Sequence, residues 1–283
     1  IVIDEAQKVE AVGVNLKLLV DHIDGIRILA AGSSSFALSH QLGEPLVGRQ
    51  WQFFLFPFSQ MELNDWEKPH EREARLPMRL IYGGYPEVVI RDSTEDKRAI
   101  LNGIVDNYLF RDLLELEGIR KSNKILQILK LIAFQIGKEV SLNEISNTAG
   151  LNVRTIEKYL DLLEKVFVIK CVNGYSKNLR KEITKNKRFY FYDNGIRNAL
   201  INNFNDLNTR DDVGQLWENY VVMERLKKQH YQRLYANNYF WRTYDQKEID
   251  WVEERDGRLF GYEIKWQPRK NSPPALWLET YPE

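Results

Sequence analysis

The chain has 283 residues, of which 43% are hydrophobic and 28% charged, a composition typical of a globular protein with two or three domains. Forty lysine and arginine residues balance 40 aspartate and glutamate residues, so overall charge gives no argument for nucleic-acid binding, which has to rest on local patches. The single cysteine, Cys171, excludes an internal disulfide and a zinc site built from several cysteines.

The chain opens on Ile1-Val2-Ile3, which has the character of a buried strand rather than of a positively charged leader. No apolar run in the sequence is long enough to span a bilayer. We therefore expect a cytoplasmic protein without a membrane partner, and a sequence that is a fragment of a longer parent.

Strand and helix patterns alternate over the first 95 residues. Apolar residues form a buried strand at 1–3, one side of a helix at 16–23 and a second strand at 26–31. Such alternation predicts a mostly parallel sheet with covering helices, which is an α/β fold. A run rich in aromatic residues from Val47 to Phe58 predicts a further strand.

Polar residues follow both of the first two predicted strands. Asp4 and Glu5 end the first strand, and Gly32 and Ser33 end the second. In P-loop ATPases the first acid at such a strand end helps to hold magnesium, and the second polarises the water that attacks the terminal phosphate. The alternative is that these polar residues only cap the helices that follow.

The period becomes helical from about residue 97 to 137, and a two-helix pattern follows. Ser141 caps a helix, Gly150 turns the chain, and a second helix spans 155–165. Two strands at 166–173 and 188–192, joined by a polar loop, complete the order of a winged helix.

The loop of this predicted wing is locally basic, which suits contacts with DNA phosphates. Its candidate nucleic-acid-binding residues are Lys177, Arg180, Lys181, Lys185, Lys187 and Arg188. The helix at 155–165 carries acids beside its basic residues, so protein packing stays open as the alternative role of this module.

Four residues in the C-terminal part fit a further pattern. Glu218 lies on a predicted helix, Asp250 lies on a predicted strand, and Glu263 and Lys265 share one face of the next strand. This is the residue order of a PD-(D/E)XK nuclease fold. Asp250 and Glu263 can hold magnesium, and Lys265 can orient or activate the water that attacks a phosphodiester. A solvated hairpin with alternating charges is the alternative.

Short blocks occur in a fixed order along nearly the whole chain: Asp4-Glu5-Ala6-Gln7, Gly32-Ser33-Ser34-Ser35, Gly48-Arg49, Pro57-Phe58-Ser59, Gly83-Gly84-Tyr85-Pro86 and Phe110-Arg111-Asp112. In order and spacing the blocks resemble the AAA+ ATPases of the AAA_14/DUF4143 family. The resemblance implies the Walker B acids Asp4 and Glu5, with Asp4 near magnesium, the sensor 1 serine Ser33, the nucleotide-contacting Gly84 and Pro86, and the phosphate-sensing Arg49 and Arg111. For the two arginines a salt bridge is the alternative role.

The family's glycine-rich loop, which ends in lysine and threonine, has no counterpart in these 283 residues. Backbone amides and the lysine of that loop cradle the β and γ phosphates. We therefore expect the chain by itself to bind ATP weakly, and the longer parent to be the ATPase.

Three regions are expected: a partial AAA+ core at 1–95, a helical lid with a winged helix at 96–200, and a small α/β restriction-endonuclease-like domain at 201–283. The expected function is an ATP- and Mg²⁺-dependent protein that couples nucleotide state to the winged-helix and nuclease-like domains, with DNA as a partner and with oligomer formation open. The alternative is a non-catalytic, STAND-like nucleotide switch whose C-terminal domains serve as interaction modules.

Overall fold

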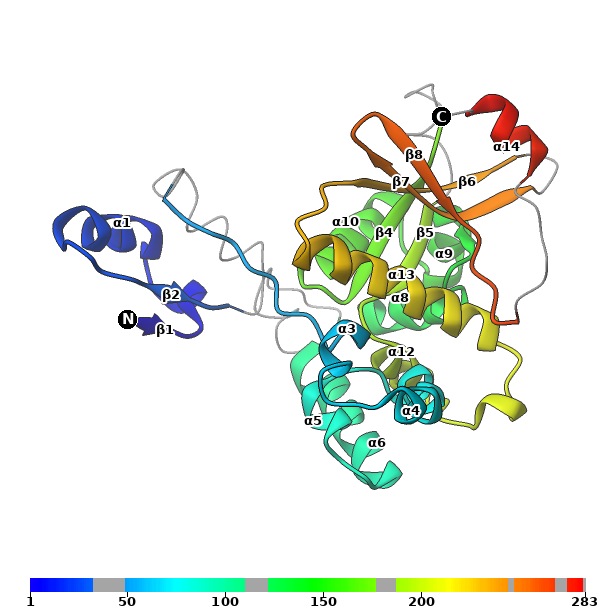
Figure 1. Cartoon of the computed structure of the whole chain (residues 1–283), viewed down its shortest axis with the longest axis horizontal. Coiled ribbons are helices and arrows are strands. Elements are labelled where there is room, and N and C mark those ends of the chain that lie inside the picture. The colour runs from blue at the N-terminus through cyan, green and yellow to red at the C-terminus, as the bar shows by residue number, and fades with distance from the viewer. Residues whose placement is uncertain (33–48, 110–121, 177–186, 244–246, 268–273, 282–283) are drawn as a thin grey trace.

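The computed structural model describes residues 1–32, 49–109, 122–176, 187–243, 247–267 and 274–281. These residues have a mixed α/β fold organised by a sheet of two strands and a sheet of six (Figure 1). Within the described ranges, no helix is both long and apolar enough to cross a bilayer.

A small N-terminal unit contains the first two predicted strands. Its elements are β1 (Val2–Ile3), η1 (Ala6–Lys8), α1 (Val12–His22) and β2 (Leu29–Ala30). The two strands pair in parallel, as the alternation of strand and helix predicts. The unit has a small core of its own, made by Ala6, Val12 and Leu16. It stands apart from the large sheet (Figure 1).

The chain reaches the main body as an extended segment over residues 49–58. The sequence predicts a strand here, but the described part of this stretch pairs with no other strand. Its aromatic rings pack on a helix instead: the rings of Phe54 and Phe56 lie 4.9 and 5.1 Å from the ring of His230. Side-chain packing therefore fixes this segment in place of a hydrogen-bonded ladder.

Short helices follow the extended segment: α3 (Gln60–Leu63), α4 (Pro69–Tyr82), α5 (Pro86–Val89), α6 (Thr94–Gly103) and the π-helical turn η3 (Ile104–Leu109). Ser59 starts α3 with a capping box, in which its side chain accepts from the Glu62 N–H and the Glu62 carboxylate accepts from the Ser59 N–H. Pro69 and Pro86 lie in the first turns of α4 and α5, where a missing N–H costs no helical hydrogen bond.

The middle of the chain contains α8 (Ser122–Phe134), β3 (Glu139–Val140), α9 (Leu142–Ala149), α10 (Val153–Lys165), β4 (Ile169–Gly174), β5 (Lys187–Phe191) and α12 (Asn194–Leu200). Ser141 caps α9, and Gly150 ends it in the left-handed conformation that favours glycine. Asn152 caps α10, so this helix begins before the predicted start at Thr155. One hydrophobic core extends from α4 through α12.

The last part contains η4 (Leu207–Thr209), α13 (Val213–Tyr231), β6 (Asn237–Arg242), β7 (Glu248–Arg255), β8 (Arg258–Tyr262) and α14 (Ala275–Thr280). The large sheet has the strand order β3-β5-β4-β6-β7-β8. In it β4 and β6 are parallel, and the other neighbouring strands are antiparallel. The helix α13 packs on the sheet through a core that includes Tyr190, Val222, Phe240 and Trp251 (Figure 1).

The large sheet continues across residue 200, where the sequence analysis places a domain boundary. Strands β3, β4 and β5 precede that residue, and β6, β7 and β8 follow it. The last strand ends at Tyr262, so Glu263 and Lys265, which the sequence predicts to lie on this strand, follow it instead. Beyond Tyr262 the backbone leaves the ladder, because the N–H of Ile264 donates to the Asp250 side chain at 2.8 Å.

Candidate functional site

The predicted nucleotide-handling acids lie at the end of β1. Asp4 is exposed, and its Oδ1 accepts from the Glu5 N–H at 3.0 Å. Glu5 has a left-handed backbone (φ 51°) and forms an ion pair with Lys8 at 3.0 Å. The N–H of Ala6 donates to the Ala31 carbonyl at 2.8 Å, which holds the ends of the two parallel strands together. Ser33 lies outside the described residues.

The other residues that the resemblance assigns to the nucleotide are dispersed. Arg49 forms an ion pair with Asp21 of α1, which is the alternative role expected for it. Gly84 and Pro86 lie at the start of α5, far from β1 (Figure 1). Arg111 lies outside the described residues. The structure therefore does not bring Gly84 and Pro86 to the ends of the N-terminal strands.

Residues 58–62 are joined to α13 by side-chain hydrogen bonds, and we call this contact the junction. Four of these bonds are described: Gln60 N to Glu224 Oε2 at 2.7 Å, Lys227 Nζ to Phe58 O at 3.0 Å, Tyr231 OH to Glu62 Oε2 at 3.1 Å, and Tyr220 OH to Gln60 Oε1 at 3.2 Å. Lys227 is buried, and its ammonium also donates to Glu224 at 3.0 Å. A buried ammonium is costly without such partners, so these contacts constrain the position of the segment.

Gly84 and Asp193 support the junction from the side of α12. The N–H of Phe58 donates to the Gly84 carbonyl at 2.8 Å, and the N–H of Gly84 donates to Asp193 Oδ2 at 2.7 Å. The other oxygen of Asp193 accepts from the N–H groups of Gly195 and Ile196, which caps α12. A Cβ atom on Gly84 would lie 2.7 Å from the Phe58 carbonyl oxygen, so the backbones approach too closely there for another residue.

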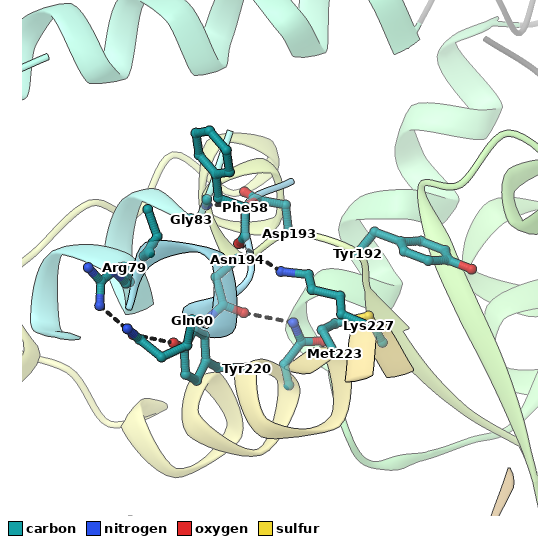
Figure 2. Close-up of a pocket in the computed structure, with 13 residues that line it drawn as sticks. Phe58, Gln60, Arg79, Gly83, Tyr192, Asp193, Asn194, Tyr220, Met223 and Lys227 are labelled. Carbon is teal, nitrogen blue, oxygen red and sulfur yellow. Dashed lines mark hydrogen bonds between the residues drawn. The ribbon is translucent and has the colours of Figure 1, made fainter. Parts of the chain in front are cut away.

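A pocket opens at the junction, between α3, α4, α12 and α13. Figure 2 shows that its polar side chains face one another, with hydrogen bonds from Arg79 to Gln60 and from Lys227 to Phe58. Arg79 also forms a buried ion pair with Glu67. Because the protein itself supplies these partners, we interpret the pocket as part of the junction.

The structure brings Glu218, Asp250, Glu263 and Lys265 together on one side of the large sheet. Lys265 Nζ lies 3.3 Å from Asp250 Oδ2 and 3.0 Å from Glu263 Oε1. Glu218 approaches from α13, and its Oε1 accepts from the Tyr190 hydroxyl at 2.7 Å. We call these four residues, together with Glu248 and Arg188, the acid cluster.

Arg188 is the member of the acid cluster that the sequence analysis assigns elsewhere, to the basic loop. Its side chain is only 3% exposed, and its guanidinium faces carboxylates rather than solvent. It lies 2.7 Å from Glu248, 3.7 Å from Glu218 and 3.8 Å from Asp250. In this position the guanidinium is not available to a DNA phosphate.

The sequence analysis does not assign Arg188, Tyr190 and Glu248 to this site, although their spacing along the strands gives a partial indication. Arg188 and Tyr190 are two apart on β5, and Glu248 and Asp250 are two apart on β7, so each pair shares one face of its strand. The spacing does not say that the two faces meet, because that depends on the order of the strands in the sheet.

Burial changes the protonation behaviour of the acid cluster. It raises the pKa of the Glu218 carboxyl from 4.5 to about 7, and the neighbouring charge of Asp250 adds to this increase. The Arg188 guanidinium and the Tyr190 hydroxyl act in the opposite direction without cancelling it. Glu218 is therefore an acid whose charge changes near neutral pH.

The acid cluster as arranged does not fit a divalent cation. One oxygen of Asp250 accepts from the Ile264 N–H and the Lys265 ammonium, and the other faces Arg188. The described residues contain no group of three histidine, cysteine or acidic side chains placed to hold a metal ion. Arg188 and Lys265 occupy the space beside Asp250 in which a metal ion would have to bind.

Of the remaining predicted nucleic-acid-binding residues, the structure describes Lys187. Lys187 is half-buried on β5, where it pairs with Val140 of β3. The other predicted residues of the basic loop, Lys177, Arg180, Lys181 and Lys185, lie outside the described residues.

Family models match three successive parts of the chain. An AAA domain model (AAA_14) matches residues 1–64, a domain of unknown function (DUF8612) matches 73–207, and a second domain of unknown function (DUF4143) matches 213–276. The first match, together with the parallel pair β1–β2 and the acids that follow β1, is that of an AAA-type protein, a class that binds nucleotides. The matches to AAA_14 and DUF4143 agree with the AAA_14/DUF4143 family that the sequence resembles.

Curated relatives come from distant organisms. An uncharacterized protein of Mycobacterium tuberculosis is 30% identical over 271 residues, which cover 94% of this chain and 58% of the relative. An uncharacterized protein of Haemophilus influenzae is 27% identical over 257 residues, covering 87% of this chain and 60% of the relative. An uncharacterized protein of Methanocaldococcus jannaschii is 23% identical over 237 residues, which cover 78% of this chain and 51% of the relative. The chain thus spans little more than half the length of these relatives, and no solved structure matches it.

Proposed function

We propose that this chain is the transmitting part of a nucleotide-responsive switch, in which the N-terminal unit senses the nucleotide and the large sheet presents the output surface. Asp4 and Glu5 at the end of β1 are the residues that would meet the nucleotide and its magnesium ion. When bound, that ion would supply charge to the phosphates. The chain's own contribution is to display two carboxylates at one strand end.

The observation that carries this proposal is the junction. Phe58, Gln60 and Glu62 belong to the segment that matches the AAA domain, and their partners on α13 belong to the segment that matches DUF4143. Hydrogen bonds between these two segments offer a direct mechanical route from the nucleotide-binding part to the sheet. A displacement of residues 49–62 has to move α13 or break the polar contacts of the junction, among them the contact of the buried Lys227 with the Phe58 carbonyl, and either change is costly.

Nucleic acid is the output ligand that the chemistry favours. The order α8, α9, α10, β4 and β5 is that of a winged helix, and the sequence between β4 and β5 contains Lys177, Arg180, Lys181 and Lys185. Such a loop suits contacts with the phosphate backbone. We propose that the nucleotide state alters how firmly this surface holds a DNA duplex.

The convergence of Glu218, Asp250, Glu263 and Lys265 favours a second candidate function, magnesium-dependent phosphodiester cleavage. The same geometry argues for the non-catalytic form, since Arg188 and Lys265 already engage Asp250. We therefore propose that the C-terminal part binds without cutting.

The test is duplex affinity in the presence and absence of nucleotide. It uses the longer protein that the resemblance implies, with a phosphate-binding loop ahead of Ile1, and a fluorescently labelled duplex at constant ionic strength. We expect an ATP analogue to change the dissociation constant by about fivefold or more. Lys227→Met should abolish this difference in duplex affinity between the two nucleotide states. The control is Lys228→Met, which changes an adjacent lysine that takes no part in the four junction bonds and should preserve the difference.

A variant with glutamine at Lys177, Arg180, Lys181 and Lys185 separates the output surface from the coupling. It should weaken duplex binding with and without nucleotide and make the affinity less dependent on salt. Equal affinity in both nucleotide states would contradict the switch. An unchanged affinity of the glutamine variant would contradict the DNA-binding surface.

A further inference from the structure

A buried arginine lies at the centre of the acid cluster. Arg188 extends from β5, and its guanidinium lies among carboxylates from two other elements, Glu218 of α13 and Glu248 and Asp250 of β7. The guanidinium also stacks over the ring of Phe240 at 4.5 Å. The arginine therefore links three parts of the fold at one point.

The position of Arg188 is explained by charge more than by hydrogen bonding. Its Nε is buried and has no hydrogen-bond partner among the described residues. Its NH2 donates to Glu248 at 2.7 Å, while the distances from NH1 to Glu218 and Asp250 exceed 3.5 Å. A guanidinium held in this way balances several carboxylates at once instead of making one ideal pair.

The acids of the cluster require such a charge. Asp250 is 2% exposed, and the side chain of Glu218 on α13 is 15% exposed. Carboxylates that are removed from water together destabilise the fold unless a cation lies between them. Proteins meet this need with a bound metal ion, with a basic side chain, or by keeping one of the acids protonated.

Lys265 completes the compensation on the other side of Asp250. Its ammonium contacts Asp250 Oδ2 and Glu263 Oε1, and the Ile264 N–H donates to the same Asp250 oxygen. A divalent ion placed between Glu218 and Asp250 would therefore meet Arg188 at contact distance and compete with Lys265 for its ligands.

We propose that Arg188 is the resident cation of the acid cluster and takes the place of a divalent metal. The cluster is then a metal-independent centre that fixes α13 to the sheet. This role does not depend on the junction or on nucleotide binding, so the two proposals fail separately.

The test is Mn²⁺ binding to the 283-residue chain, measured by titration calorimetry on the natural protein and on Arg188→Met. Methionine is uncharged and shorter than arginine, so it opens the position between the carboxylates. We expect Arg188→Met to bind Mn²⁺ about tenfold or more tighter than the natural protein. Adding Asp250→Asn to Arg188→Met should remove this gain.

Arg188→Lys is the matched control, because it keeps the positive charge and should bind Mn²⁺ no better than the natural protein. Circular dichroism and thermal unfolding establish that each variant is folded. If Arg188→Met does not fold, the comparison of the natural protein with Asp250→Asn decides, and equal weak binding by both supports the proposal. Tight Mn²⁺ binding by the natural protein that Asp250→Asn abolishes would overturn it, as would a folded Arg188→Met without a gain.

Discussion

Glu218 shows how the fold controls the charge of a single residue. Its carboxylate is 15% exposed, lies near Asp250, and accepts a hydrogen bond from Tyr190. Burial and the adjacent negative charge both favour the protonated form. The folded protein therefore holds a proton on Glu218 at pH values where the unfolded chain has lost it.

This difference predicts that stability falls as pH rises. A pKa raised from 4.5 to about 7 contributes stability that is fully present below pH 4.5 and lost as pH rises through about 7. Between pH 5 and pH 8 the loss amounts to about 2–3 kcal/mol.

Urea unfolding at the two pH values measures this loss. Glu218→Gln has no proton to lose and keeps an oxygen that can accept from Tyr190. We therefore expect its stability to decline less over the same interval. Parallel declines in the natural protein and the glutamine variant would show that Glu218 does not cause the dependence.

The sequence indicates which acids and which lysine form the acid cluster, but not the arginine between them. Glu218, Asp250, Glu263 and Lys265 follow from helix and strand spacing, and the structure places them together. Arg188 is grouped with the basic loop because its sequence neighbours are basic. Its side chain turns inward because β5 pairs with β3 and β4, and such pairing is a property of the folded sheet rather than of the local sequence.

At the scale of elements, the close approach of two backbones at Gly84 holds the extended segment against α5. The Phe58 carbonyl that meets Gly84 also accepts from Lys227, so the glycine and the junction share one peptide group. A side chain at residue 84 has to displace this peptide.

Gly84→Ala is therefore expected to destabilise the protein by about 1–3 kcal/mol, the usual cost of a residue too large for its site. Gly214→Ala is the matched control, because a Cβ at residue 214 meets nothing within 4 Å. Alanine favours helix there, so this change should be neutral or stabilise by up to about 1 kcal/mol. Urea unfolding at one pH compares the two, and equal effects would contradict the assigned contact.

The accuracy of the element predictions follows from how local their signals are. Ser141 and Gly150 mark the ends of α9 because capping depends on neighbouring backbone groups. The aromatic run before Pro57 has a strand-like composition but packs on α13, a helix that begins at Val213. A contact so distant in sequence overrides the local preference of the segment.

At the scale of the whole molecule, the parallel pairing of β4 with β6 unites the middle and last parts of the chain in one sheet. The α/β class follows from the alternation of strands and helices, and the parallel pair β1–β2 agrees with it. The continuity of the sheet across residue 200 does not follow from the sequence, because pairing between distant strands leaves no local pattern.

The central claim is that nucleotide binding in the N-terminal unit reaches α13 through the junction. Hydrogen exchange along residues 213–231 tests it without knowledge of the output ligand. The protein carrying a phosphate-binding loop ahead of Ile1 is compared with and without magnesium and an ATP analogue. The 283-residue chain alone and Lys227→Met serve as controls.

We predict that nucleotide slows exchange in the half of α13 that contains Tyr220, Glu224 and Lys227 by about threefold or more, because ordering residues 49–62 tightens the junction. Lys227→Met and the 283-residue chain should show no such change. Nucleotide that protects the end of β1 while the exchange of α13 stays the same would contradict the account.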